Sequence, residues 1–258
     1  MAIGSYYVSY NGTRCTAAGL YPESRPSLPT PQWRATKVTI PGRDGDLYLE
    51  DGALEDISIP ITFGFYGPAS GWGDSFRALK AWALSEDTTL YLRARQLVFS
   101  DDTAYRYLVR RVIVNTTERV AKAIGKATVT FICEGWSYLQ SGLTQVSVTG
   151  GTASITMDNP TGFSTMPIFV FQGAEVGTVT FTFSRPDGTT GTFSVQTTAG
   201  QQYRINTRLK TVTNASGANR LSVTSGDLDE WKLQPGTTTV TITGNYSSAL
   251  YYPMWRTL

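Results

Sequence analysis

The residues of this chain that could do chemistry are its carboxylates and its aromatic side chains, because histidine is absent. Without histidine the chain cannot build a Ser-His-Asp or Cys-His catalytic site, a His-ligated zinc site or a histidine proton relay. Cys15 and Cys133 lie too far apart for a Cys-x-x-Cys motif, and no glycine-rich phosphate loop occurs. We therefore expect no catalytic residue, no cofactor, no metal and no enzymatic activity.

Four of the 20 acidic residues cluster after residue 43, at Asp44, Asp46, Glu50 and Asp51. Their spacing does not match a twelve-residue calcium loop, and turn carboxylates are usually solvated, so a calcium site is disfavoured. A glycosidase needs only two carboxylates at a set separation, which nearly any chain can supply. A cell-wall-degrading enzyme therefore stays open as an alternative, with no motif to support it.

The aromatic side chains suggest sugar binding, because Trp and Tyr rings stack on pyranose rings. The candidate glycan contacts are Trp231, Tyr251, Tyr252 and Trp255, all near the C-terminal end. The alternative is that these rings pack in a β-sandwich core, and it is favoured because aromatic residues in sandwiches mostly serve packing.

Composition narrows the class of protein further. The chain has 258 residues, 41% hydrophobic and 12% aromatic, with a net charge of only +2. That balance favours a globular β-rich protein and disfavours sequence-specific nucleic-acid binding.

We expect two inert buried thiols, with one long-range disulfide left open. The first residues lack the features of a signal peptide, and no apolar run could span a bilayer, so synthesis in a cytosol and no membrane insertion are expected.

The first half of the chain predicts strands, one helix and an extended arm. A strand at Trp33–Thr39 is followed by a tight Pro-Gly turn, and residues 47–66 show period-two apolar alternation through Ile57 and Phe63. A helix over about 75–84 is expected, with Asp74 as its cap. The proline-rich segment 22–31 resists strand pairing and predicts a surface arm.

The second half predicts an antiparallel β-sandwich or jelly roll, with a domain boundary between residues 140 and 141. Residues 1–140 would form an N-terminal β-sandwich with one short helix and an extended belt, and residues 141–258 a second sandwich, making the whole chain all-β. The strands expected in the second half are Val146–Thr149, Ala153–Met157, Pro167–Phe171, Thr178–Phe183, Gly191–Thr197, Tyr203–Asn206, Thr211–Thr213, Leu221–Val223 and Thr238–Thr243.

Several motifs occur in an order that resembles one known family. Ile40-Pro41-Gly42-Arg43-Asp44-Gly45 stands between strands and before a short amphipathic helix. In the second half come Asn159 to Gly173, with Pro167 before an apolar strand, then Ser225-Gly226-Asp227-Leu228, Leu233-Gln234-Pro235-Gly236 and a closing Pro253-Met254-Trp255-Arg256. Together they resemble the distal tail (Dit) protein of siphophages, with Asn206 where that family often has Asp.

The resemblance implies a structural virion protein at the phage tail tip, made and assembled in the host cytoplasm. Six copies would form one ring, or two rings back to back, between the tail-tube protein and the tail-tip hub. The galectin-like C-terminal domain would support receptor-binding proteins or touch host glycans. The candidate ring contacts are the arm at 22–31 and Pro41, Gly42, Arg43, Asp44 and Gly45. A monomeric carbohydrate-binding accessory module is the alternative from another class.

Overall fold

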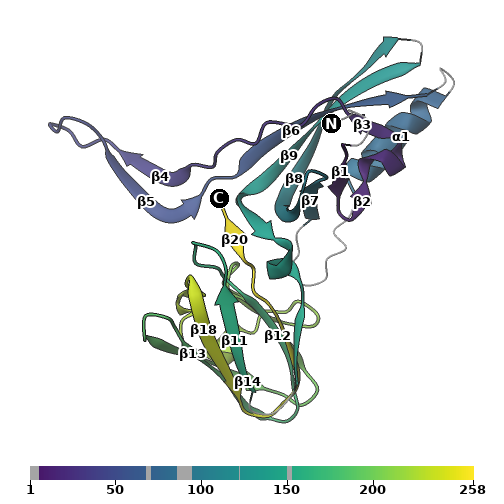
Figure 1. The fold of residues 1–258 in the computed structure, drawn as a ribbon. Helices are drawn as coiled ribbons and strands as arrows, with labels where there is room; N and C mark the ends of the chain where they lie inside the picture. The colour runs from purple at the N-terminus through teal and green to yellow at the C-terminus, as the bar shows by residue number, and fades with distance from the viewer. Residues whose placement is uncertain (1–5, 68–70, 86–94, 122, 150–152) are drawn as a thin grey trace. The chain divides into compact units, whose positions relative to one another are not determined.

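The computed structural model describes residues 6–67, 71–85, 95–121, 123–149 and 153–258, and it is mostly antiparallel β. The chain divides into two compact units, each with its own hydrophobic core. Unit 1 comprises Met1–Ser137 and Leu258, and unit 2 comprises Tyr138–Thr257 (Figure 1). Among the described helices, none is long and apolar enough to cross a membrane.

Unit 1 is built on one large sheet in which the strand order is β2-β1-β7-β8-β9-β6-β3. The strands are β1 (Val8–Tyr10), β2 (Thr13–Arg14), β3 (Leu20–Pro22), β6 (Ile57–Tyr66), β7 (Arg95–Phe99), β8 (Asp102–Ala121) and β9 (Ile124–Leu139).

The predicted alternation in β6 places its apolar residues in the core of unit 1. Ile59 and Ile61 are at most 1% exposed, and β6 pairs with β9 so that Ile59 lies opposite Phe131. The ring of Tyr10 in β1 lies 5.2 Å from that of Phe131, although two strands separate β1 from β9 in the sheet. The sheet therefore curls until its two halves face each other. For this part of the chain the sequence analysis predicted a β-sandwich.

Helix α1 (Trp72–Ala83) covers part of this core with its apolar stripe. The ring of Trp82 packs 5.4 Å from that of Phe63, and its Nε1 donates to the Thr13 carbonyl oxygen at 3.0 Å. The predicted helix is confirmed but its predicted cap is wrong. Gly71 is the N-cap residue, and Asp74 lies inside the first turn because the helix begins earlier than the polar pattern suggested.

Both cysteines belong to the core of unit 1. Cys15, in the 3-10 helix η2 (Cys15–Ala18), and Cys133 in β9 are fully buried and free. Burial raises the pKa of both thiols. The prediction of buried thiols is confirmed, and the long-range disulfide left open by the sequence does not form.

Unit 2 is a sandwich of two five-stranded antiparallel sheets, as the turn spacing predicted. One sheet contains β10 (Val146–Thr149), β19 (Tyr246–Tyr252), β12 (Ile168–Gly173), β15 (Gln202–Asn206) and β16 (Thr211–Asn214), in that order. The other contains β11 (Ala153–Asn159), β18 (Gly236–Thr243), β13 (Gly177–Ser184), β14 (Thr190–Thr197) and β17 (Thr224–Ser225). The remaining short elements are η4 (Gln140–Leu143), η5 (Leu221–Val223), η6 (Leu228–Glu230) and β20 (Arg256–Thr257).

One predicted strand of unit 2 is wrong. Residues 221–223 form the 3-10 helix η5, in which the Val223 backbone N–H donates to the Arg220 carbonyl at 3.2 Å. The pairing with β14 is made instead by Thr224 and Ser225 in β17. Leu221 and Val223, two apolar residues on either side of Ser222, suggested a strand locally, but tertiary pairing selected the neighbouring residues.

Candidate functional site

A two-stranded hairpin of unit 1 stands apart from the large sheet. Strand β4 (Trp33–Val38) pairs with β5 (Leu47–Leu54) and with no other described strand. No residue from 32 to 56 is buried. Figure 1 shows β4 and β5 as a two-stranded hairpin outside the large sheet of unit 1. An isolated two-stranded hairpin is at best marginally stable in water.

The tip of the hairpin is shaped by the motif that the sequence singled out. Gly42 has φ +80°, and the Arg43 N–H donates to the Ile40 carbonyl oxygen at 3.2 Å. With Pro41 before Gly42, this is the geometry of a type II turn, in which the third residue must adopt positive φ. All of Pro41, Gly42, Arg43, Asp44 and Gly45 are exposed. The five predicted ring contacts are therefore brought together at one accessible tip, and their contact with another subunit stays a prediction.

The carboxylates beside the tip are engaged within the hairpin itself. Asp46 accepts from Lys37 Nζ and from the Thr39 hydroxyl, both at 2.8 Å, and this lowers the pKa of Asp46. Asp51 accepts from Arg34 Nε at 2.6 Å. No group of three or more carboxylates or cysteines among the described residues could hold a metal ion. Asp46 and Asp51 thus brace the two strands.

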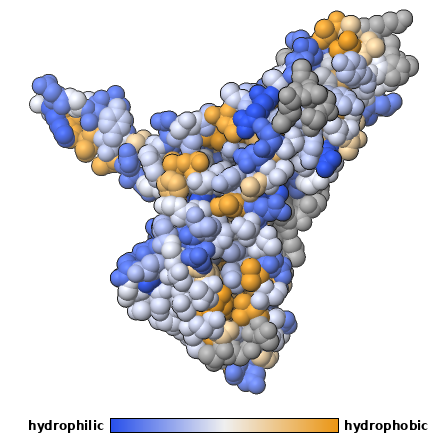
Figure 2. All heavy atoms as spheres, in the orientation of Figure 1, coloured by the Kyte–Doolittle hydropathy of each residue, from blue (hydrophilic) through white to orange (hydrophobic). Residues whose placement is uncertain are grey.

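One face of the hairpin is apolar and has no cover. Val38 lies opposite Leu47, and Thr36 lies opposite Leu49, so these four side chains project from the same face. We call them the hairpin face. Leu49 is 54% exposed and Val38 is 37% exposed. Figure 2 shows hydrophobic residues on this hairpin among hydrophilic ones. Exposed apolar side chains gathered on one strand face are typical of a protein contact.

The proline-rich arm is anchored more firmly than the sequence suggested. Of the predicted arm, residues 23–31 form no strand, but Pro22 is the last residue of β3 and pairs with Phe63 in β6. Pro22 and Pro26 are buried, and Glu23 pairs with Lys126 Nζ at 2.6 Å. This segment helps to hold unit 1 together. A role of the arm in contacts between subunits stays a prediction.

The four candidate glycan contacts are all buried. Trp231 is 1% exposed, and Tyr251, Tyr252 and Trp255 are 7%, 8% and 7% exposed. Trp231, Tyr251 and Trp255 belong to the core cluster of unit 2. Their burial favours the packing role that the sequence left open, because a ring that stacks on a sugar must present a free face. Sugar contact by these four residues itself stays untested.

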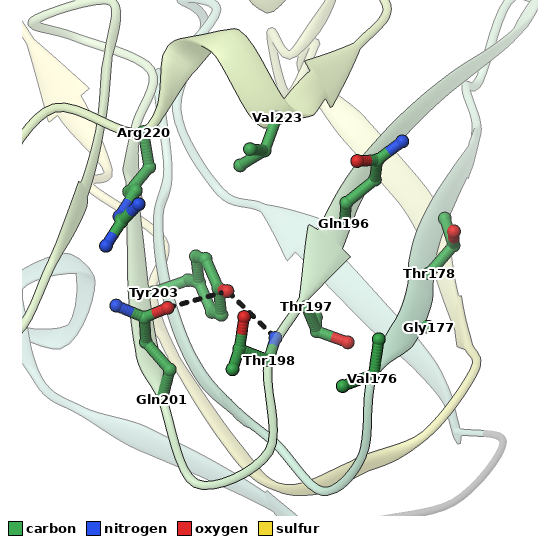
Figure 3. A pocket seen from close by; sticks show the side chains of 10 residues that line it. All are labelled: Val176, Gly177, Thr178, Gln196, Thr197, Thr198, Gln201, Tyr203, Arg220 and Val223. Carbon is green, nitrogen blue, oxygen red and sulfur yellow. Dashed lines mark hydrogen bonds between the residues drawn. The ribbon is translucent and has the colours of Figure 1, made fainter.

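A polar pocket in unit 2 was not predicted from the sequence. It has a volume of about 370 Å³ and lies between β13, β14, β15 and η5 (Figure 3). Its lining includes Gln196, Gln201, Tyr203, Arg220 and Val223. These residues come from separate segments, and none belongs to a local motif, so no signal in the sequence could have grouped them.

The Tyr203 hydroxyl organises the floor of this pocket. It accepts from the Thr198 backbone N–H and donates to Gln201 Oε1, both at 3.0 Å. These two bonds, drawn as dashed lines in Figure 3, fix the loop between β14 and β15. They also orient the Gln201 amide, because its oxygen is committed to Tyr203 and its nitrogen is left to donate elsewhere.

Comparisons with known proteins support the fold. No protein-family model and no curated protein matches the sequence. Among solved structures, the crystal structure of the Dit protein (gp 19.1) of phage SPP1 matches with a TM-score of 0.60 and 16% sequence identity. The match covers 98% of this chain and 99% of that chain. That protein is described as a paradigm of the hub adsorption apparatus in phages that infect Gram-positive bacteria. The chain therefore has a Dit-like, mostly antiparallel β fold.

Proposed function

We propose that this chain is a structural protein of a siphophage tail tip, in which six copies form a ring. The ring joins the tail-tube protein to the tail-tip hub, supports receptor-binding proteins, and has no enzymatic role. The observation that carries the proposal is the extent of the likeness to SPP1 Dit. It covers 98% of this chain and 99% of that chain, so both units of this chain are matched.

The hairpin supplies a feature that a ring needs. A closed ring is made by a heterologous interface, in which one surface of each subunit meets a different surface of the next. The hairpin face offers one such surface, because Val38, Leu47 and Leu49 are not buried by their own chain. We propose that this face and the tip at Pro41–Gly45 contact the neighbouring subunit.

The experiment is a solution mass by light scattering across a wide range of protein concentrations, followed by negative-stain images of the main peak. A ring of six would have a mass of about 169 kDa, against 28.2 kDa for the single chain. Six-fold rings with an open centre support the proposal. A particle of 28.2 kDa at every concentration, both alone and mixed with the tail-tube protein from the same phage genome, contradicts it.

A further inference from the structure

The pocket of unit 2 holds the side chain of Arg220, a cation that no side chain in the described part of the chain neutralises. Arg220 lines it, and no acidic residue does. Among the described residues Arg220 forms no ion pair, and its Nε atom is buried without a hydrogen-bond partner. A guanidinium stays charged at every physiological pH, and a buried N–H group without a partner costs free energy. The uncompensated charge of Arg220 in the pocket favours an external acceptor with negative charge.

A second donor lies on the same side of the pocket. The nitrogen of the Gln201 amide has no partner among the described residues, because Tyr203 holds only the amide oxygen. Figure 3 shows the Gln201 amide and the Arg220 guanidinium on one side of the pocket. Two such groups, one of them charged, form a fork of N–H donors suited to a carboxylate or phosphate.

The rest of the lining carries no charge. Gln196 is exposed and comes from the opposite side of the pocket, next to Thr178 in the paired strand. Val176 and Val223 add two small apolar surfaces. Amides and hydroxyls with a little apolar surface suit a ligand with many hydroxyl groups. A volume of about 370 Å³ is within the range of small-molecule sites.

We infer that this pocket binds a sugar-like unit that is rich in hydroxyl groups and carries one anionic group, either a carboxylate or a phosphate. Arg220 and Gln201 hold the anionic group, and Gln196 on the far side bonds to hydroxyls. The inference does not depend on ring formation, and it uses none of the four buried aromatic residues that the sequence suggested for glycan contact.

The test uses the full chain and four probes: D-glucuronate, D-glucose 1-phosphate, D-glucose and inorganic phosphate. Binding is measured by saturation-transfer NMR and titration calorimetry. We expect at least one of the two anionic sugars to bind at least about tenfold more tightly than glucose and than inorganic phosphate. A preference between glucuronate and glucose 1-phosphate then identifies the source of the charge.

Variants separate this site from general attraction by charge. Arg220→Gln should weaken binding of the anionic sugar at least about tenfold, because it removes the charge and keeps a polar side chain. Lys232→Gln is the matched control, since Lys232 is exposed in the same unit and does not line the pocket. Gln196→Ala, which alters an exposed side chain, should weaken binding of the anionic sugar more than binding of phosphate. It remains informative if Arg220→Gln fails to fold.

Three results would overturn the inference. One is that none of the probes binds. Another is that inorganic phosphate binds as tightly as both anionic sugars, which would mean a site for an ion only. The third is that Arg220→Gln and Lys232→Gln reduce binding equally.

Discussion

The ring centroid of Trp231 lies 4.4 Å from that of Phe183, in the middle of the unit 2 core. Phe169, Phe181 and Phe193 surround the same indole at 4.9–5.2 Å. Edge and tilted contacts of this kind add to the free energy gained by burying each ring. Trp231 is therefore a packing residue in the core of the unit 2 sandwich.

Replacing Trp231 by Ala should lower the free energy of unfolding by about 3–5 kcal/mol, because it leaves a large cavity among four phenylalanines. The measurement is urea denaturation followed by circular dichroism. Trp33→Ala is the control, because Trp33 is 46% exposed in the hairpin and should cost far less. Equal stability of Trp231→Ala and the parent protein would contradict the packing role.

Leu49→Lys should shift the assembled ring toward monomers, because it places a charge on the hairpin face proposed to contact the next subunit. Tyr48→Lys is a matched control, since Tyr48 is the adjacent residue, is 61% exposed and points from the opposite face. Light scattering on both variants is the measurement. If Tyr48→Lys opens the ring and Leu49→Lys leaves it intact, the contact lies on the other face.

Arg43→Glu should reduce ring formation without changing the thermal midpoint of the separated chain. Arg43 is exposed at the hairpin tip and forms no ion pair with any described residue, so its charge contributes little to the stability of its own chain. Thermal melting of the monomer and light scattering of the assembly check the two parts. Rings that still form after this charge reversal would remove Arg43 from the contact.

Deleting residues 22–31 is a weaker test of the same interface. Pro22 and Pro26 are buried, and Glu23 pairs with Lys126. We expect this deletion to lower the thermal midpoint of unit 1 as well, so a loss of rings could not be assigned to the arm alone.

The carboxyl group of Asp187 should titrate well below the ordinary range. The Thr189 hydroxyl at 2.6 Å, the Gln234 amide at 2.8 Å and the Thr189 N–H at 2.9 Å lower the pKa of Asp187 to about 2. Because the folded-state pKa is below the unfolded value, these bonds stabilise the turn above about pH 4, and that stabilisation is lost as the pH falls toward 2.

The measurement for Asp187 is an NMR titration of its carboxyl carbon. Thr189→Val should raise the pKa of Asp187, because it removes the hydroxyl that donates the shortest of these bonds. Thr237→Val, which changes a threonine whose hydroxyl bonds to Asp158, should leave the pKa of Asp187 unchanged. An Asp187 pKa near 4 in the parent protein would contradict the hydrogen-bonded turn.

Local sequence patterns were reliable where a local cause fixes the structure. Alternation in Ile57–Phe63 predicted a strand with one buried face, because successive side chains of a strand point to opposite sides. The same logic failed at residues 221–223, where the local preference for a strand lost to pairing by β17. The start of α1 was also misplaced, since Gly71 rather than a polar side chain caps it.

The sequence by itself determined what this protein cannot do and how its turns are shaped. Lack of histidine excludes whole classes of catalysis, and Pro41-Gly42 predicts a tight turn because glycine enters positive φ at low cost. Only the tertiary structure decided that Trp231 is core and that Arg220 shares a pocket with Gln201. These facts depend on contacts between distant segments, and no local pattern of residue types specifies such contacts.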